Sequence, residues 1–197
     1  MYTERECSNQ ERDKAMASIL KDMATGTVAG LIGIMAHVGT AQFMWDWTKR
    51  TSPEDIKREH AIEPKDPFPL LAEKLGAIIG VTPTEMQERQ FEQYVTVGTG
   101  ATMGALYAVT ARRWPLGWVA GGVVFGTLFW AIEDETMGPV MGLAGENTQY
   151  PMEAHVRGWA AHVAFGVVTA AIARSLGVHS QSGPWSANQN GTRSKRG

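Results

Sequence analysis

The chain has 197 residues, which suits a single domain with tails, and its formal net charge of −2 offers no overall attraction for nucleic acid. The mean hydropathy of −0.18 is that of an ordinary soluble protein, but the charges are gathered in blocks that leave long apolar stretches between them. The only cysteine, Cys7, excludes an intrachain disulfide and a CxxC metal or redox site. We expect no nucleic-acid partner, no cofactor and no resident metal.

The N-terminal stretch is charged throughout, which argues against a cleavable signal peptide and predicts a cytoplasmic N-terminal segment, 1–23. Four later stretches contain no Lys, Arg, Asp or Glu: 23–45, 93–111, 114–132 and 158–173. A spanning helix needs about 20 apolar residues. We therefore predict an all-α, polytopic integral membrane protein with about four transmembrane helices and the lipid bilayer as its surroundings. The membrane domain is expected at 24–176, with spans at 24–47, 95–111, 116–132 and 155–176.

A soluble bundle with buried Ala- and Gly-rich helices is the alternative. The four stretches lack polar faces, and a soluble helix that is apolar all round needs a larger protein to bury it.

An extended first outer loop, 48–90, joins the first two spans. Ser52 followed by Pro53 predicts the start of a helix in this loop. The segment 70–79 predicts a short amphipathic helix that can lie on the membrane surface. The segment 82–85, Thr-Pro-Thr-Glu, matches a capping box and predicts the start of the helix that runs into the second span.

The distribution of basic residues predicts the orientation. Arg112 and Arg113 occupy the short link between the second and third spans, and a basic run ends the chain. The link between the third and fourth spans contains acids but no Lys or Arg. Basic residues favour the cytoplasmic side, so both termini are expected in the cytoplasm, although Lys49 and Arg50 in the first outer loop disagree. The tail 177–197, rich in Ser, Gly, Asn and Gln, is predicted to be disordered and cytoplasmic.

Glycines four residues apart indicate close helix packing, because such a stripe lets two backbones approach. The glycines predicted to pack helices are Gly26, Gly30, Gly100, Gly104, Gly117, Gly121, Gly122, Gly126 and Gly166. Packing within one chain is the ordinary interpretation. The alternative uses one of these faces for a homo-oligomer or a larger membrane complex.

Three consecutive acids, Glu133, Asp134 and Glu135, follow the third span without a turn signal. A helix that continues past Ile132 would place at least one carboxylate near the apolar layer, where it must be paired, protonated or hydrated. The alternative is that these acids only end the span in water.

Histidines lie within the first and fourth spans, at His37 and His162, and His155 begins the fourth span seven residues before His162. Histidines with acids can bind a divalent metal or relay protons, although a buried histidine more often makes an interhelical hydrogen bond. Pairing of Arg157 with an acid of the cluster would lower the cost of burial. The candidate polar cluster is Glu133, Asp134, Glu135, His155, Arg157 and His162, with no catalytic residue assigned.

The second half of the chain resembles the YagU-like inner-membrane proteins, a bacterial family of unknown function. The resemblance extends over about 25–176 and rests on Trp-Ala-Ile-Glu-Asp-Glu at 130–135, Gly-Pro at 138–139, Tyr-Pro at 150–151, and two histidines. It implies a small multi-pass protein of the bacterial inner membrane. It also implies that Asp134, Glu135, Pro151, His155 and His162 are family motif residues. The second span of the family often carries a histidine where this chain has Thr96, which puts a two-histidine relay in doubt.

Three hypotheses for function remain. The first is a non-enzymatic membrane protein that is proton- or pH-responsive or resembles a small transporter. The second is an accessory subunit that packs on a larger membrane complex through its glycine faces. A membrane enzyme is the least supported, because no nucleophile or cofactor motif accompanies the acids.

Overall fold

The computed structural model describes residues 2–63 and 65–178, and every regular element within these ranges is helical. The prediction of an all-α chain is therefore confirmed. The four segments predicted as spans lie in or largely in four long helices: α1 (Tyr2–Thr51), α4 (Glu85–Ala111), α5 (Trp118–Ile132) and α7 (Met152–Ser175).

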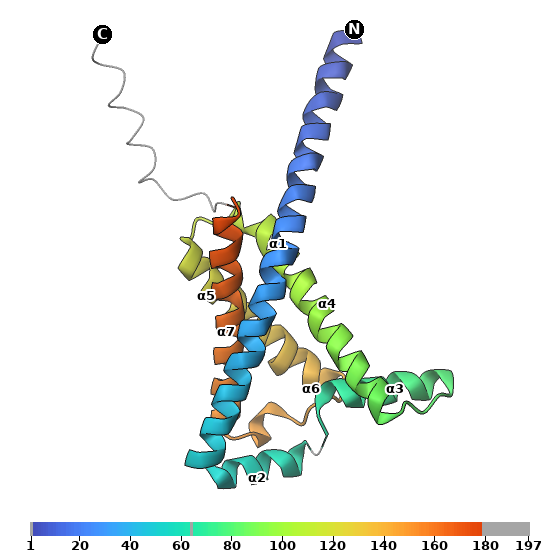
Figure 1. Cartoon of the computed structure of the whole chain (residues 1–197), viewed down its shortest axis with the longest axis vertical. Coiled ribbons are helices and arrows are strands. Elements are labelled where there is room, and N and C mark those ends of the chain that lie inside the picture. Colours follow the sequence, from blue (N-terminus) through green and yellow to red (C-terminus); the bar gives the residue numbers. More distant parts are fainter. Residues whose placement is uncertain (1, 64, 179–197) are drawn as a thin grey trace, which may run out of the picture.

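Helix α1 is a single rod that begins at Tyr2, well before the predicted start of the first span at residue 24. At 1.5 Å per residue, a helix of 50 residues is about 75 Å long. This length is more than twice the hydrocarbon thickness of a bilayer, about 30 Å. The N-terminal part of α1 extends alone beyond the other helices (Figure 1).

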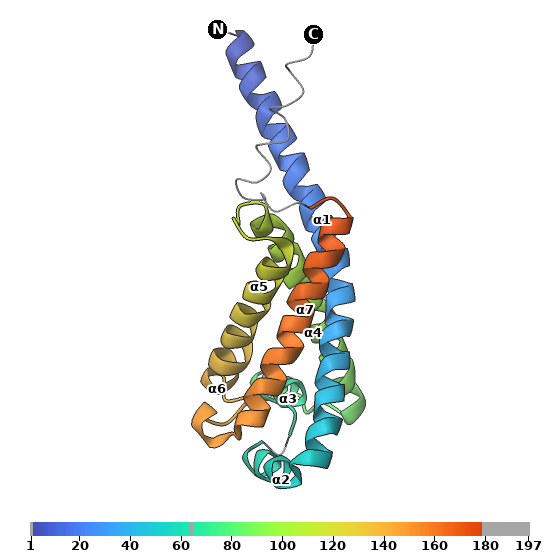
Figure 2. The ribbon, with the colours of Figure 1, turned by 90° about the vertical axis from the view of Figure 1, so that its left-hand side faces the viewer.

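The four long helices form an up-and-down bundle. Helix α1 packs along α4 and α7, and α7 also packs along α5, whereas α4 and α5 share little contact. The middle of α1, the end of α7 and the α4–α5 turn lie at one end, which we call the terminal end (Figures 1 and 2). The opposite end, which we call the loop end, carries α2 (Pro53–Ile62) and α3 (Pro67–Ile79).

Glycine brings α1 and α4 to backbone contact. A Cβ atom on Gly30 would lie 2.0 Å from the carbonyl oxygen of Gly100, and one on Gly26 would lie 2.3 Å from the carbonyl oxygen of Gly104. A larger residue at any of these four positions must therefore push the helices apart.

The α5–α7 contact is built in the same way. A Cβ atom on Gly122 would lie 2.7 Å from the carbonyl oxygen of Gly166, and one on Gly126 would lie 2.3 Å from that of His162. The predicted stripe of Gly117 and Gly121 is different. A Cβ on Gly117 would meet nothing within 4 Å, and one on Gly121 would make only ordinary contacts. Gly117 precedes α5 as its N-cap and faces no neighbouring helix.

The loop end departs from the sequence prediction in two places. Helix α3 begins at Pro67 rather than at residue 70, since proline is well suited to the first turn of a helix. The capping box is formed by Thr84 and Gln87, two residues later than predicted. Thr84 accepts a hydrogen bond from the backbone N–H of Gln87, and the Gln87 side chain accepts one from the backbone N–H of Thr84. Residues 81–84 belong to no helix, and α4 begins only at Glu85, directly after Thr84.

A cluster of aromatic rings fills the bundle interior. Tyr107 and Phe125 meet edge to face with ring centroids 5.3 Å apart, and Phe129 and Phe165 meet at 5.5 Å. Val178 is buried in the same core, and its backbone N–H donates to the carbonyl oxygen of Ala173 at 2.9 Å. The chain is therefore packed through Val178, which corrects the predicted start of the disordered tail at residue 177. The rest of that tail, 179–197, lies outside the described residues.

Within the described residues, two stretches are long and apolar enough to cross a membrane: Asn9–Thr51 of α1, and α7. Helix α5 has 15 residues, below the lower limit of about 17 for a span. It continues without interruption into a π-helical turn, η1 (Glu133–Met137), and a short helix, α6 (Gly138–Val140). All four long helices expose large apolar side chains, among them Ile32 and Met35 on α1, Val97 on α4, Leu128 on α5 and Val156 on α7. These outer surfaces are compatible with a lipid environment.

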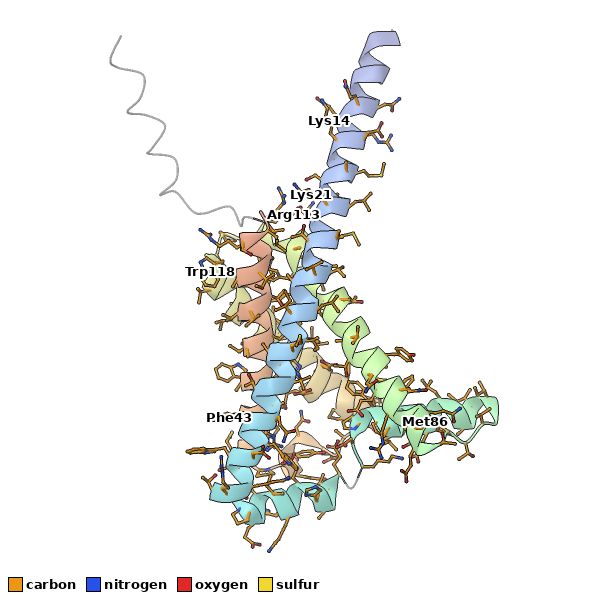
Figure 3. The ribbon with its side chains drawn as sticks, in the orientation of Figure 1. Lys14, Lys21, Phe43, Met86, Arg113 and Trp118 are labelled. Atoms are coloured by element: carbon orange, nitrogen blue, oxygen red, sulfur yellow. The ribbon has the colours of Figure 1, made fainter. Side chains whose placement is uncertain are left out.

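The terminal end carries basic side chains and one buried ion pair. Lys14, Lys21 and Arg113 lie at or beyond this end, whereas Met86 lies at the loop end (Figure 3). Arg112 donates to both carboxylate oxygens of Asp22, at 2.5 and 2.7 Å, and so joins the end of α4 to α1.

Candidate functional site

The three consecutive acids lie in η1, the π-helical turn that continues α5. The hydroxyl of Thr136 donates to the carbonyl oxygen of Ala131, five residues earlier, at 2.8 Å. A π turn has one more residue per hydrogen-bonded ring than an α turn, and such turns are frequent at functional sites. The turn keeps the acids on helical backbone beside α7 instead of releasing them into a loop.

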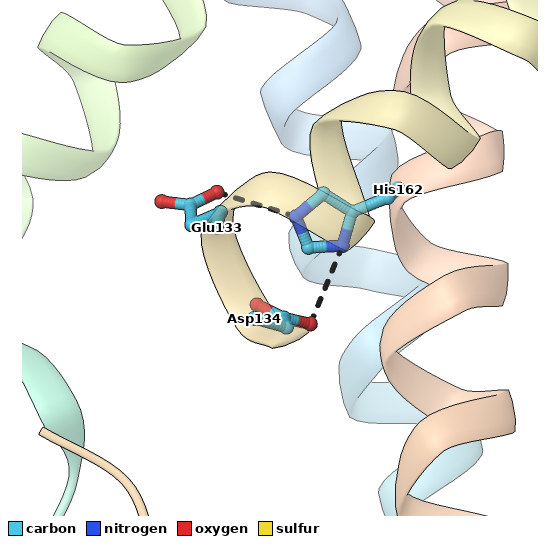
Figure 4. Close-up of side chains that lie close together, drawn as sticks. All are labelled: Glu133, Asp134 and His162. Atoms are coloured by element: carbon cyan, nitrogen blue, oxygen red, sulfur yellow. Dashed lines mark hydrogen bonds and ion pairs between the residues drawn. The ribbon is translucent and has the colours of Figure 1, made fainter. Parts of the chain in front are cut away.

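His162 lies at the middle of this site, with 3% of its side chain exposed. Its Nε2 atom is 3.2 Å from a carboxylate oxygen of Glu133, and its Nδ1 atom is 3.7 Å from one of Asp134 (Figure 4). The Nδ1 atom also lies 2.9 Å from the carbonyl oxygen of Gly158, one turn earlier on α7. Because that carbonyl can only accept a hydrogen bond, Nδ1 carries the proton in this contact and Nε2 faces Glu133.

Two further rings hold the imidazole of His162 in place. The ring of His37, from α1, meets it edge to face with centroids 4.6 Å apart, and Phe129, from α5, meets it at 4.8 Å. Gly158 leaves space for the second carboxylate, since a Cβ atom there would lie 2.6 Å from the Oδ2 atom of Asp134. Three helices therefore fix the position of one histidine.

Glu135 and His155 form a second pair beside the first. The Nδ1 atom of His155 is 2.6 Å from a carboxylate oxygen of Glu135, and its Nε2 atom is 3.1 Å from the carbonyl oxygen of Asn147. Asn147 begins the 3₁₀ turn η2 (Asn147–Gln149), and its side chain donates to the carbonyl oxygen of Glu135 at 2.7 Å. Both ring nitrogens of His155 are thus occupied by hydrogen bonds.

Arg157 does not pair with the acidic cluster, contrary to the sequence expectation. Its guanidinium makes an ion pair with Glu59 of α2 and lies 4.7 Å from the ring centroid of Trp45. The reason is that α2 folds back across the loop end and brings Glu59 to the start of α7. The contact fastens the first outer loop to the fourth long helix.

Glu63 and Tyr150 form a third hydrogen-bonded pair at the loop end. The hydroxyl of Tyr150 donates to Glu63 at 2.7 Å and accepts from the backbone N–H of Gly145 at 2.9 Å. Burial and the Glu63 carboxylate both raise the pKa of Tyr150. Burial raises the pKa of Glu63, while the hydrogen bond from Tyr150 opposes that rise.

Eight ionisable residues at the loop end form one electrostatic unit, which we call the polar centre: Glu59, Glu63, Glu133, Asp134, Glu135, His155, Arg157 and His162. The unit contains five carboxylates against one arginine and two histidines. Even with both histidines protonated, five negative charges face three positive ones. The polar centre therefore holds an excess of negative charge.

The structure brings together five of the six residues in the predicted cluster, as two neighbouring sets on η1 and α7, and places Arg157 against α2 instead. Sequence reasoning did not single out Glu59, Glu63 or Tyr150. The available signals were the predicted helix start at Ser52 and the Tyr-Pro pair at 150–151, but neither shows which side chains face α7.

No protein-family model matches this chain, and neither a curated protein nor a solved structure shows significant similarity to it.

Proposed function

We propose that this chain is a small multi-pass protein of the bacterial inner membrane, similar to the YagU-like proteins. Helices α1, α4, α5 and α7 are its four spans, and α5 is lengthened by η1 and α6. Both termini lie in the cytoplasm. The exposed apolar surfaces of the long helices support this proposal. The Arg112–Arg113 turn at the terminal end and the lack of Lys and Arg between α5 and α7 support the orientation, because basic residues favour the cytoplasmic side, whereas Lys49 and Arg50 at the loop end count against it.

We also propose that the protein is a transporter-like component that binds a cation at the polar centre, and that it is not an enzyme. The observation that carries this proposal is His162, almost fully buried and held between Glu133 and Asp134. Ionisable groups inside a membrane bundle are expensive to bury and commonly mark the path of an ion. The excess of carboxylates makes a cation the suitable occupant.

The membrane placement is tested by fractionation of cells that express the untagged chain. We expect the protein in the membrane pellet, and we expect it to remain there after an alkaline carbonate wash. A detergent-free monomer in the high-speed supernatant would contradict the four-span proposal. It would also contradict transport of a cation, because transport requires a protein that spans the membrane.

Cation handling is tested with the purified full chain in liposomes that contain either a zinc-sensitive or a pH-sensitive dye. The double variant Glu133→Gln/Asp134→Asn keeps the shape of both side chains and removes their charges, so we expect it to lose most of the flux. Glu153→Gln is the matched control, because Glu153 lies exposed on α7. Flux no higher than in empty liposomes, with both dyes, would contradict the proposal. A signal from the pH dye alone would identify protons as the transported cation.

The accessory-subunit hypothesis is weaker, because the close glycine contacts lie between helices of the same chain. Gly26, Gly30, Gly122 and Gly126 are each covered by another helix of the bundle. Purification of the chain with a fixed partner in mild detergent would revive that hypothesis.

A further inference from the structure

We infer that Glu133, Asp134 and His162 form a binding site for a divalent transition-metal ion of the Zn²⁺ class. This inference deepens the proposed function and rests on it for its biological role. Each of the three residues offers one ligand atom, and these atoms all lie within 4.8 Å of one another. They come from two elements, η1 and α7, which the Gly126–His162 contact holds together.

The spacing of the ligand atoms suits one ion. The Nε2 atom of His162 and the Oε2 atom of Glu133 are 3.2 Å apart. Two ligands at about 2.0–2.1 Å from a tetrahedral Zn²⁺ lie at nearly this separation. Figure 4 shows Glu133 and Asp134 on opposite sides of the imidazole. Asp134 now lies on the Nδ1 side, so its side chain must turn toward the Nε2 side to complete a three-ligand set.

The surroundings of His162 resemble those of a metal-binding histidine. Metal-ligating histidines usually donate their other ring N–H to a carbonyl or a carboxylate, which fixes the tautomer and the ring orientation. Here Nδ1 lies 2.9 Å from the carbonyl oxygen of Gly158. The Nε2 lone pair is then the one that faces the carboxylate of Glu133.

The charge of the polar centre also favours a divalent ion. Its carboxylates exceed its positive groups even when both histidines are protonated, and buried charge without a partner is destabilising. With His162 neutral as a ligand, the five carboxylates face only Arg157 and protonated His155, so one ion of charge +2 would offset most of the excess.

The ligand chemistry selects the class of metal. Imidazole suits Zn²⁺, Fe²⁺ and Ni²⁺ better than Mg²⁺ or Ca²⁺, which prefer oxygen ligands alone. Three protein ligands leave a fourth tetrahedral position open to water. An open position permits an ion to be exchanged, as a transporter-like protein requires.

Zinc binding to the full-length protein in nanodiscs tests this inference. The protein is first stripped with a chelator, and bound Zn²⁺ is then measured by equilibrium dialysis at pH 7.5. We expect one Zn²⁺ per chain in the wild type. Glu133→Gln, Asp134→Asn and His162→Gln should each weaken binding at least about tenfold. His60→Gln and Glu153→Gln, which change a histidine and an acid outside the ligand set, should bind as the wild type does.

A second measurement guards against variants that do not fold. Co²⁺ bound at a four-coordinate site has intense visible absorption, which we expect in the wild type and in both controls. Circular dichroism must show native helix content in Glu133→Gln before its loss of Co²⁺ absorption is counted. Wild type that binds no Zn²⁺, or ligand variants that bind it equally well, would overturn the inference. Dye-detected proton flux without zinc binding would overturn the metal site alone. Zinc binding without flux of either cation would leave the site in place and contradict the transport proposal.

Discussion

The two ends of the bundle treat buried charge differently. At the terminal end, one acid meets one base, since Asp22 is held by both arms of the Arg112 guanidinium, which is 46% exposed. At the loop end, five carboxylates share one arginine and two histidines, and the Arg157 side chain is only 11% exposed. Balanced charge of the first kind serves structure. Unbalanced charge that is only partly exposed, as at Glu133 (31% exposed) and Asp134 (40% exposed), costs stability, and such ionisable groups are frequent at functional sites. The contrast therefore separates the part of the fold that holds the helices from the part that can bind.

The largest expected effect tests the packing near the terminal end. Gly26→Leu places a side chain against the backbone of Gly104 and Ala105, so we expect a loss of about 3 kcal/mol or more in stability. Gly39→Leu makes the same change on the same helix, where a Cβ would meet nothing within 4 Å, and should change stability by less than about 0.5 kcal/mol. Thermal unfolding in detergent measures both. Equal losses would show that the close α1–α4 contact is absent.

The next effect tests the arginine at the loop end. Arg157→Met leaves Glu59 buried without its partner, and we expect a loss of about 3 kcal/mol. Adding Glu59→Gln removes the unpaired charge and should recover part of the loss. A double variant no more stable than Arg157→Met would mean that Arg157 contributes mainly through its packing on Trp45.

The comparison is sharpest when the same chemical change is made at both ends. Asp22→Asn breaks the two-armed ion pair and should destabilise the protein by about 2 kcal/mol. Glu133→Gln removes one of the excess negative charges and should stabilise chelator-treated protein by about 1 kcal/mol. Denaturation of the two variants beside the wild type gives the sign of each effect. A loss of stability in both would contradict the idea that the polar centre is over-charged.

The smallest effect depends on pH. The pKa of Glu63 is raised in the folded state above its ordinary value of 4.5, mainly by burial. Stability that depends on its protonated form is complete below pH 4.5 and is lost as the pH rises through the folded-state pKa. Glu63→Gln cannot lose that stability, so its melting temperature should rise relative to wild type as the pH increases from 4.5. Glu54→Gln, on the exposed surface of the same helix, controls for removal of one charge. If the difference in melting temperature between Glu63→Gln and wild type did not change with pH, burial would not raise the pKa of Glu63.

The sequence predicts the helices well because apolar stretches and glycine spacing are local properties. The segments around His37 and His162 contain too few charges to be anything but buried or lipid-facing helix, and both are helical in the structure. The capping box was misplaced because Thr82 and Thr84 both offer the right side chain. Pro83 does not decide between them, since a proline also directly follows Ser52, the N-cap of α2.

The polar centre could be predicted only in part. The run Glu133–Asp134–Glu135 could be recognised because three acids directly follow an apolar stretch. The spacing of His155 and His162 predicts that both lie on one helix. The pairing of Arg157 with Glu59 depends on how α2 folds back across the loop end, and the pairing of the acids with His155 and His162 depends on how η1 lies beside α7. Neither of these is a local property of the sequence.

The length of α1 gives the protein a spacer at its terminal end, which we propose to be the cytoplasmic one. Residues 9–21 are exposed and no other helix accompanies them, while about 20 helical residues extend for about 30 Å. A fluorophore attached near the start of α1 should therefore be held clear of the lipid headgroups, with weak energy transfer to an acceptor in the bilayer. Force applied to this rod would act on the helix that carries His37, whose ring contacts that of His162, and so would reach the polar centre from the other end of the bundle.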